Sequence, residues 1–543
     1  MWLMSFISAV LALTGASCPE ELGEFELERF ERLAEHPVEL NSASRSRLLG
    51  SGLMSAYQVA SLLDYRSRNG DILSYTELSL MDGFSPATAE ALKLFTTLKS
   101  SAPPGRLRDT RTEHDLLLKA SVREYGGTLA AGGVKYGLHL GDAAEFHWGS
   151  RVSYSERELT PGTASAAYYG RHRLGKVVAG DFCARFGQGL ACWSGFSMSG
   201  FSSASAMSRS GAGLSPSSSF TRSLHGVGAD FSLGKWALTA AWAWPGKRAA
   251  TSPGWAKPAI INVCRTGRNA SAGMTLAGNT ISADWRVGRP AMSFFGEVGA
   301  CGRTFVPAAV AGLMAVPQYG VKAAVVGRYY PADFKSSFGG PVRSSSRTSD
   351  EFGVATGMSS NSLNLTLDAA YRPSTEVQQY KAVFQLHPQY DLSENFTLKP
   401  SLRLAARLKP GEAVPLRREA RLDLGAEHGK WNLSTRLDLV RFKDWAWLWY
   451  AEAGYRKSWV RWTLFRIDNW DDRIYCYERD APGNFSSPAY YRRGWSLAAM
   501  LALKKTRRHA FYLRASVMGW PWTLEDAPPT KAEVKLQYQA SLF

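Results

Sequence analysis

The chain of 543 residues lacks an internal apolar run that approaches the ~18–20 uninterrupted residues of a membrane-spanning helix. This absence excludes a protein that crosses a membrane through ordinary helices. The only long apolar run stands at the start, in MWLMSFISAVLALTGASC. Its core, residues 6–13, has the length of the apolar region of a signal peptide, and small residues follow at 15–17. No Lys or Arg precedes the run, yet the pattern predicts that residues 1–18 are an export signal.

Cysteine is scarce, with six residues that form neither a CxxC pair nor a Cys/His set at zinc spacing. Scattered cysteines in a long exported chain are more often buried small hydrophobic residues than a disulfide framework. We therefore expect no structural disulfide. Cys18 leaves a lipid-anchored N-terminus open, although Gly15 stands where a lipoprotein signal has a large aliphatic residue.

The motifs of common enzymes are also missing. None of the nine histidines stands in HExxH, Ser194 in WSGF is not part of a GxSxG turn, and there is no phosphate-binding loop. Asp468, Asp471 and Asp472 lie close together, but they lack the oxygen count and the glycine of a calcium loop, so a solvated loop is expected. We expect no enzyme activity, no cofactor and no metal site.

What the chain does have is apolar bulk finely mixed with polar residues. Hydrophobic residues make up 45% of the sequence, yet the mean hydropathy is −0.20. Charge is divided unevenly: residues 1–99 hold 8 Lys or Arg and 13 Asp or Glu, a net −5, and the remainder holds 56 and 34, a net +22. A basic body fits nucleic acid, anionic lipid, or a charged barrel rim and lumen, and its sign alone does not choose among them.

Residues 19–99 follow a helical pattern. Residues 19–35 form an acidic stretch with apolar residues at helical spacing, and we expect one helix there. Further along, Asn41 precedes a possible helix, and two capping boxes pair Ser55 with Gln58 and Ser74 with Glu77. These signals predict four short helices in two hairpins, at about 42–49, 56–68, 75–80 and 86–97.

The stretch from 41 to 92 resembles the tandem helix-hairpin-helix module of bacterial competence DNA receptors. Its pattern covers about sixty residues of the sequence. The matching positions are Asn41, Ala43, Ser44, Leu48, Gly52, Leu53, Tyr65, Arg66, Gly70, Glu77, Leu78, Gly83 and Leu92.

The resemblance implies non-specific DNA binding, in which a glycine turn and the next helix N-terminus direct N–H groups at a phosphate. Two departures weigh against it: Met54 and Ser85 replace a second turn glycine, and residues 36–99 hold six basic and six acidic residues. The alternative is a compact domain that docks a protein. The residues expected to meet phosphate are Gly52, Leu53, Met54, Ser55, Arg66, Arg68, Gly83, Phe84, Ser85 and Lys93.

Beyond a linker at 100–112 the apolar period changes to two. Runs of ~8–14 alternating residues, separated by Gly, Pro, Ser or Asp, predict a transmembrane β-barrel with apolar side chains toward lipid. From ~20 residues for each strand and turn we expect about 20 strands, an even number. The clearest runs are 116–125, 145–154, 236–244, 362–371, 395–408, 416–427, 432–442, 495–504, 511–517 and the terminal strand.

Tryptophans and the chain end agree with a barrel. Trp445, Trp447 and Trp449 share one face of a predicted strand, as an interfacial girdle requires. Further girdle candidates are Trp459, Trp462, Trp495, Trp520 and Trp522. The final strand alternates and ends on an aromatic residue, like the signal by which outer-membrane barrels are recognised for insertion. Its residues are Val534, Leu536, Tyr538, Leu542 and Phe543.

Three other segments resemble a poorly characterised family of Gram-negative outer-membrane proteins that join periplasmic helix-hairpin-helix repeats to a barrel. They are residues 180–196, 328–353 and 471–494, and the resemblance implies architecture but no activity. Residues 186–189, FGQG, read as a strand kink, with a ligand role for Gln188 as the alternative. Segments 198–223 and 331–352 are too long for barrel turns and form either mobile surface loops or inward constrictions.

The sequence therefore predicts a Gram-negative outer-membrane β-barrel at residues 113–543 with a small all-α domain at 36–99 in the periplasm. The expected function is a pore or receptor that binds or takes up DNA without sequence specificity. The alternative is a docking component whose hairpins bind a periplasmic protein. The expected partners are outer-membrane lipid, the barrel-assembly machinery, and either DNA or that protein.

Overall fold

The computed structural model describes most of the chain, from Trp2 to Leu542. The described residues are 2–99, 111–141, 143–153, 158–170, 173–195, 200–217, 223–244, 258–267, 269–289, 291–318, 320–345, 347–360, 362–374, 379–393, 395–408, 416–506, 508–523 and 527–542.

The N-terminal residues form short helices and one small parallel sheet. The helices are α1 (Trp2–Thr14), the 3₁₀ turn η1 (Pro19–Glu21), α2 (Glu24–Glu35), α3 (Arg45–Ser51), α4 (Ala56–Asn69), α5 (Tyr75–Ser79) and α6 (Pro86–Leu92). The sheet pairs β1 (Val38–Glu39) with β2 (Thr96–Thr97). No helix in the described part of the chain is long and apolar enough to cross a membrane.

The helix ends follow the predicted caps in part. Ser55 and Gln58 form the predicted capping box. At α5 the box is incomplete, because Ser74 accepts from the Glu77 N–H but the Glu77 carboxylate accepts from Leu73 instead. Asn41 is not a cap: Ser44 begins α3, and the Asn41 amide is buried and bonds Ile72 and Lys99.

One apolar cluster holds this helical domain together. Phe30, Leu48, Leu62 and Phe95 are fully buried in it, and the ring centroids of Phe30 and Phe95 lie 5.1 Å apart in an edge contact. Helix α1 joins the cluster through Phe6, whose ring lies 5.9 Å from Phe95. The export signal at 1–18 stays a prediction.

The rest of the chain forms one closed antiparallel barrel. Its strands are β3 (Thr112–Glu124), β4 (Thr128–Leu140), β5 (Ala144–Ser153), β6 (Glu158–Tyr169), β7 (Leu174–Arg185), β9 (Leu224–Leu233), β10 (Trp236–Trp244), β11 (Ala259–Thr266), β12 (Ala270–Ala277), β13 (Thr280–Arg289), β14 (Met292–Cys301), β15 (Val306–Gln318), β16 (Val321–Tyr330), β17 (Glu351–Ser359), β18 (Leu363–Arg372), β19 (Gln379–Pro388) continued by β20 (Tyr390–Ser393), β21 (Phe396–Leu408), β22 (Leu416–His428), β23 (Trp431–Arg441), β24 (Trp445–Tyr455), β25 (Ser458–Ile467), β28 (Arg492–Lys505), β29 (His509–Gly519) and β30 (Lys531–Leu542).

The described residues form a barrel of 24 strands when β19 and β20 are counted as one and the short inner β8 (Gly213–Pro216) is left out. The expectation of about 20 strands was therefore wrong, although an even number was right. The error lies in the turns at one barrel end, which have two to four residues, so each strand uses less chain than the assumed ~20 residues. The barrel closes where β30 pairs with β3, from His114 opposite Leu542 to Glu124 opposite Ala532.

Side chains alternate between an apolar outer face and a polar inner face. On β10, Leu238 and Trp242 are exposed and Thr239 is buried, the reverse of a soluble barrel that shows polar groups to water. Trp445 at 62% exposure lies on the outer face, as predicted. Trp459 is 3% exposed and faces inward, so it does not belong to an outer girdle, and Trp520 is buried as well.

The predicted insertion signal lies in β30. Val534, Leu536 and Leu542 are exposed on the outer face, and the Tyr538 ring packs 4.7 Å from the Phe511 ring. Phe543 lies outside the described residues. Recognition of this strand by an insertion machinery stays a prediction.

The long segments between strands fold inward. Between β7 and β9, Phe201, Met207 and Leu214 are buried within the barrel, with the 3₁₀ turn η2 at Ala204–Met207. Residues 331–345 do the same, and so does the loop after β25. That loop carries the 3₁₀ turn η3 (Trp470–Asp472), β26 (Ile474–Tyr475) and β27 (Ala489–Tyr490). The described parts of 198–223 and 331–352 are thus inward constrictions.

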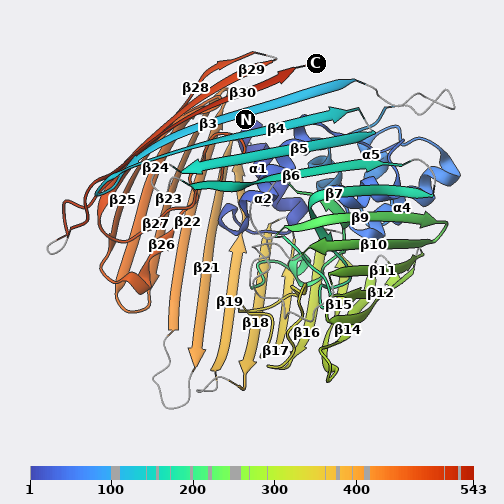
Figure 1. Cartoon of the computed structure of the whole chain (residues 1–543). Coiled ribbons are helices and arrows are strands. Elements are labelled where there is room, and N and C mark those ends of the chain that lie inside the picture. The colour runs from blue at the N-terminus through green and yellow to red at the C-terminus, as the bar shows by residue number, and fades with distance from the viewer. Residues whose placement is uncertain are drawn as a thin grey trace.

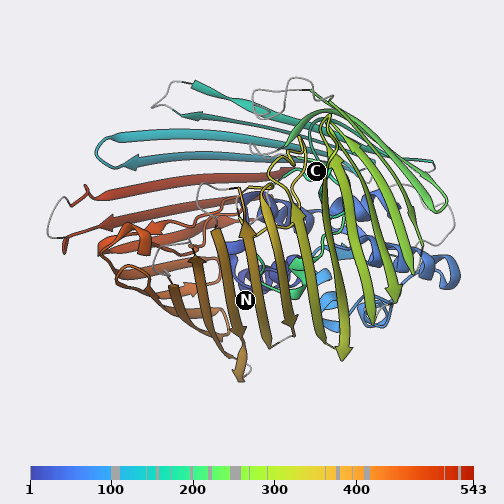
Figure 2. The same cartoon turned by 90° about the horizontal axis from the view of Figure 1, so that it is seen from below.

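The helical domain lies within the ring of strands. Figures 1 and 2 show the blue helices enclosed by the barrel, with the region of α4 and α5 extending past the strand ends at the right. The sequence predicted a separate domain in the periplasm, whereas the barrel encloses most of this domain (Figures 1 and 2). At the barrel end where β3 begins and β30 finishes, every connection between neighbouring strands has two to four residues, and the three inward loops start from the opposite end.

Candidate functional site

Charged contacts hold the helical domain against the inner wall of the barrel. Glu20 of η1 pairs with Arg421, at 3.3 Å, and with Arg436. The Glu28 carboxylate of α2 lies 2.8 Å from the Lys135 ammonium, and Arg45 of α3 donates to Thr266 at 2.7 Å. The acidic N-terminal region thus faces basic strands, which accounts for the uneven charge seen in the sequence.

Glu20 is the centre of this contact. Burial by itself raises the pKa of its carboxyl, but the Arg436 and Arg421 guanidinium groups lower it more, so the net pKa lies well below the ordinary value. The Tyr477 N–H of an inward loop donates to the same carboxylate at 3.0 Å. One acidic residue of the domain therefore joins two barrel strands and a loop.

Glu31 of α2 has the opposite shift. Burial raises the pKa of its carboxyl from the ordinary 4.5 to about 8, and Glu35 and Glu28 add to the rise, although the Gly483 N–H donates to it. Between these two pH values the docked domain binds more protons than the free one. Its docking free energy should therefore weaken as the pH rises from 4.5 to 8.

We expect Glu31→Gln to remove this pH dependence and to strengthen docking at pH 8 by roughly 1–3 kcal/mol, since one pKa unit corresponds to about 1.4 kcal/mol. Hydrogen exchange of α2 in the full chain, measured across this pH range, checks the expectation. Glu90→Gln, which alters an exposed pair with Lys93 on α6, is the matched control. An unchanged pH dependence in Glu31→Gln would contradict the assignment.

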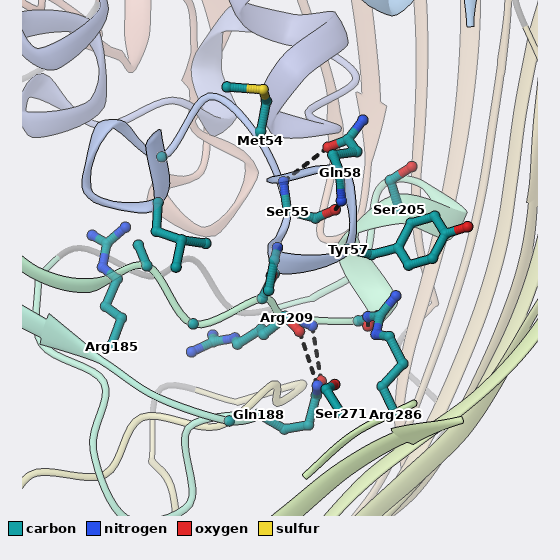
Figure 3. Close-up of a pocket in the computed structure, with 18 of the residues that line it drawn as sticks. Met54, Ser55, Tyr57, Gln58, Arg185, Gln188, Ser205, Arg209, Ser271 and Arg286 are labelled. Carbon is teal, nitrogen blue, oxygen red and sulfur yellow. Dashed lines mark hydrogen bonds between the residues drawn. The ribbon is translucent and has the colours of Figure 1, made fainter. Parts of the chain in front are cut away.

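A cavity of about 630 Å³ lies between the helical domain and the barrel wall. Its lining combines the turn from Gly52 to Ser55, residues of the inward loops that follow β7 and β16, and inner residues of β10 to β16. Figure 3 shows Met54, Ser55, Tyr57 and Gln58 on one side of it and arginines on the other. Four acidic residues line the cavity against eight basic ones, Arg29, Arg45, Arg185, Arg209, Arg286, Arg289, Lys322 and Arg343.

Neutral acceptors and an aromatic ring hold the arginines in place. Trp193 lies between two of them, 4.5 Å from the Arg209 guanidinium carbon and 5.5 Å from that of Arg185. Arg209 also donates to the Gly340 carbonyl, and Arg185 donates to the Ser194 carbonyl at 3.0 Å. These acceptors are neutral groups that orient the guanidinium groups by hydrogen bonds.

Further basic groups come from the opposite wall and from α2. Arg286 of β13 donates to the Ser208 hydroxyl at 2.7 Å. Arg29 packs over the turn at Gly52, where a Cβ would lie 2.5 Å from an Arg29 nitrogen; the positive φ of 67° at this helix end independently favours glycine. The Arg29 side chain also covers the Phe30 ring at 5.0 Å.

Burial, and to a smaller extent the neighbouring cations, lower the pKa values of these arginines. Burial lowers the pKa of Arg209 to about 9, with Arg343 and Arg185 contributing. Burial and Arg185 lower the pKa of Arg29 to about 10. A bound anion would relieve this repulsion, so the cavity is suited to a phosphate or carboxylate group.

The predicted phosphate-binding residues are only partly brought together. Gly52, Leu53, Met54, Ser55 and Gly83 line the cavity. The predicted charges do not: Arg66 donates to the Ala43 carbonyl at 2.8 Å, Arg68 pairs with Asp64, and Lys93 pairs with Glu90. Phe84 is buried, and Ser85 caps α6.

Sequence reasoning missed the basic residues that lie near the turn at Gly52. They are dispersed over α2, strands and loops, and no local spacing marks them. The one available signal was the segment from Gly180 to Phe196, where Gln188 was considered as a ligand. Gln188 lines the cavity, its N–H donates to Glu297 at 2.6 Å, and its side chain exchanges hydrogen bonds with the Arg209 backbone.

Asp468 and Asp472, which were expected in a solvated loop, have protein partners. Asp472 is fully buried and accepts from the Lys443 and Asp444 N–H groups at 3.1 and 2.9 Å. Asp468 pairs with Arg466 and Arg493. Asp472 therefore supports the inward loop and is not the solvated residue that was expected.

Searches with the sequence against protein-family models and against curated proteins find no match. The fold is similar to solved β-barrels. The translocation pore of the P pilus usher PapC gives a TM-score of 0.38 at 10% identity, over 79% of this chain and 99% of that chain. OccK7 of Pseudomonas aeruginosa gives 0.32 at 10% identity, over 79% and 98%. OccK2 of the same organism, in complex with glucuronate, gives 0.32 at 10%, over 80% and 98%. Similarities this weak assign neither a substrate nor an activity to the chain.

Proposed function

We propose that this chain is a channel of the bacterial outer membrane whose lumen is closed by its own helical domain and whose basic cavity receives an anionic solute. The observation that carries the proposal is the gathering of Arg29, Arg185, Arg209 and Arg286 around one cavity inside a closed barrel. The proposal involves binding and passage, and no chemical reaction.

The membrane location rests on the distribution of side chains. The outer face carries exposed apolar residues on strand after strand, and hydrocarbon is the medium in which such a surface is stable. Outer-membrane barrels have short turns on the periplasmic side and longer loops outside. By this rule, the end where β3 begins faces the periplasm, and α4 and α5 extend toward it. Lipid and the barrel-assembly machinery are the partners that this location implies.

We expect the full chain in detergent to bind inorganic pyrophosphate, and Arg209→Ala to weaken that binding by roughly tenfold, as loss of one charge-assisted contact does. Titration calorimetry at low salt measures both proteins. Arg508→Ala, in an exposed turn away from the cavity, is the matched control and should bind like the unaltered chain. Equal affinities for the Arg209 variant and the unaltered chain would remove the cavity as the anion site.

DNA remains a second candidate solute, because the turn at Gly52 faces arginines of α2, the strands and the inward loops, which lie outside the hairpins. The cavity is enclosed by the barrel wall, so in this arrangement a single strand has better access than a duplex. The same titration with a short oligothymidylate distinguishes the two solutes. A strand that uses the cavity should bind with an affinity that falls steeply with salt and falls further in Arg209→Ala.

The docking interpretation has one observation of its own. Leu73 and Leu80, which flank α5, are each 83% exposed where the helical domain extends beyond the strands. Exposed leucines at this end are available to a periplasmic protein. This role is compatible with a closed channel, since a partner that pulls on α5 would act directly on the domain in the lumen.

A further inference from the structure

Histidine and carboxylate side chains gather where the end of α2 meets the barrel wall. The His36 ring, directly after α2, stacks on the His139 ring of β4 with centroids 4.0 Å apart. His147 of β5 lies beside them, its ring centroid 5.2 Å from that of His139. Asp115 of β3 contacts both His36 and His139, at 2.7 and 3.7 Å.

We propose that His36, Asp115 and His139 bind one divalent transition-metal ion, of which Zn²⁺ is the probe, and that this ion fastens the helical domain to the wall. His36 Nε2, one Asp115 oxygen and a His139 nitrogen offer one ligand atom each, and these atoms lie within 4.8 Å of one another. Zn²⁺ holds nitrogen and oxygen ligands at about 2.0–2.2 Å, so its ligand atoms lie roughly 3–3.5 Å apart. Because the His36 and His139 rings are stacked, one ring must turn out of the stack for both nitrogens to face a common ion.

The residues behind the ligands fit a metal site as well. Metal-binding histidines usually give their second ring nitrogen to a carboxylate. His36 Nδ1 lies 2.8 Å from the Glu113 carboxylate, and His139 Nδ1 lies 3.9 Å from that of Glu145. The second oxygen of Asp115 accepts from the Ser541 hydroxyl at 2.7 Å. His36 and Asp115 are thus oriented from behind, and Glu145 lies near His139 without a hydrogen bond to it.

Charge also favours a cation. Glu113, Asp115 and Glu145 bring three carboxylates to a small, partly buried volume, with the Arg32 guanidinium as a nearby permanent positive charge. Tyr169 donates to Glu145 at 2.5 Å and His147 lies 3.1 Å from the same carboxylate, so that residue is already held in place. Two histidines and one carboxylate with an open position are a donor set that Zn²⁺ and Fe²⁺ both accept.

The location gives the ion a structural consequence. His36 and Asp115 are 79 residues apart in the chain and belong to the helical domain and the barrel respectively. Asp115 and Ser541 also lie on the two strands that close the barrel, β3 and β30. An ion at this point would join the domain in the lumen to the closure seam of the wall, and its loss would free the end of α2.

The test is Zn²⁺ binding by the refolded full chain, measured by calorimetry and by the metal content after dialysis. We expect a single tight site, weakened roughly tenfold to a hundredfold in His139→Ala and in Asp115→Asn. His428→Ala removes an exposed histidine at the same end of the barrel and should leave the site intact. Co²⁺ as a second probe should give visible absorption bands that disappear in His139→Ala and persist in His428→Ala.

Hydrogen exchange keeps the proposal separate from a folding defect and from the anion cavity. Zn²⁺ should slow exchange of α2 in the unaltered chain and in Arg209→Ala, but not in His139→Ala. The proposal is overturned if the unaltered chain binds no Zn²⁺, or if His139→Ala and Asp115→Asn bind it as tightly as the unaltered chain. Either result would leave the cluster as ion pairs between a protonated histidine and carboxylates.

Discussion

A chain that lacks residues 19–99 should conduct ions at least about ten times better than the full chain in planar bilayers, because barrels of 16–18 strands already enclose an open channel. In this barrel of 24 strands the helical domain occupies the lumen, and its removal leaves only the inward loops as constrictions. Single-channel recording on both proteins, reconstituted in the same lipid, measures the difference. Circular dichroism must show an intact sheet in the shortened chain.

A tether provides the matched control for this prediction. A Cβ placed on Gly175 of β7 would lie 3.0 Å from the Ser46 Cβ of α3, close enough for a disulfide after a small adjustment. The double variant Ser46→Cys, Gly175→Cys should stay closed when oxidised, even under conditions that open the full chain, and should recover on reduction. If deletion of 19–99 leaves the conductance unchanged, the loops close the channel and the helical domain is not its plug.

Loss of the Glu20 carboxylate should weaken the docking of the helical domain by about 3–5 kcal/mol, the usual cost of leaving buried charges without their partner. Glu20→Gln removes the negative charge that Arg421 and Arg436 share, and both guanidinium groups lie inside the barrel. We expect faster hydrogen exchange throughout α2 to α6 and easier proteolysis of this region, with barrel strands unaffected.

The control for Glu20 is again an exposed acidic residue. Glu90→Gln breaks a surface pair with Lys93 and should change exchange by the equivalent of less than about 1 kcal/mol. The dependence on pH gives a second measure. Because the folded pKa of Glu20 is lowered, its contribution is present above the ordinary carboxyl pKa and is lost as the pH falls below it. An unaltered acid response in Glu20→Gln would show that other groups control docking.

Local patterns predicted the secondary structure where side chains alternate cleanly or caps are distinct. The ten predicted strands correspond to observed strands, and Ser55 with Gln58 begins α4 as expected. Strand β4, TLAAGGVKYGLHL, was not recognised because its small residues and glycines hide the alternation. Helix α6 ends at Leu92 and not near 97, because the following residues leave the helix to pair Thr96 with Val38.

The candidate site could be predicted only in part, because a sequence pattern shows only what neighbouring residues determine. The turn at Gly52 is a local feature, since a residue with positive φ must end α3, and the sequence shows it. Its basic surroundings are not local: Arg29, Arg185, Arg209 and Arg286 meet only when the barrel closes around the domain. Counting charges within residues 36–99 therefore understated the positive charge at this turn.

By itself, the sequence determined that this protein is a β-barrel with an apolar exterior and a small helical domain before it, because period-two alternation and helix caps are set by neighbouring residues. It also recorded an acidic N-terminal region and a basic remainder. Only the tertiary structure decided that the acidic N-terminal region lies inside the basic barrel. There Glu20 pairs with Arg421 and Arg436, and His36 lies beside Asp115. Long-range ion pairs depend on which surfaces meet, and no periodicity along a chain encodes that meeting.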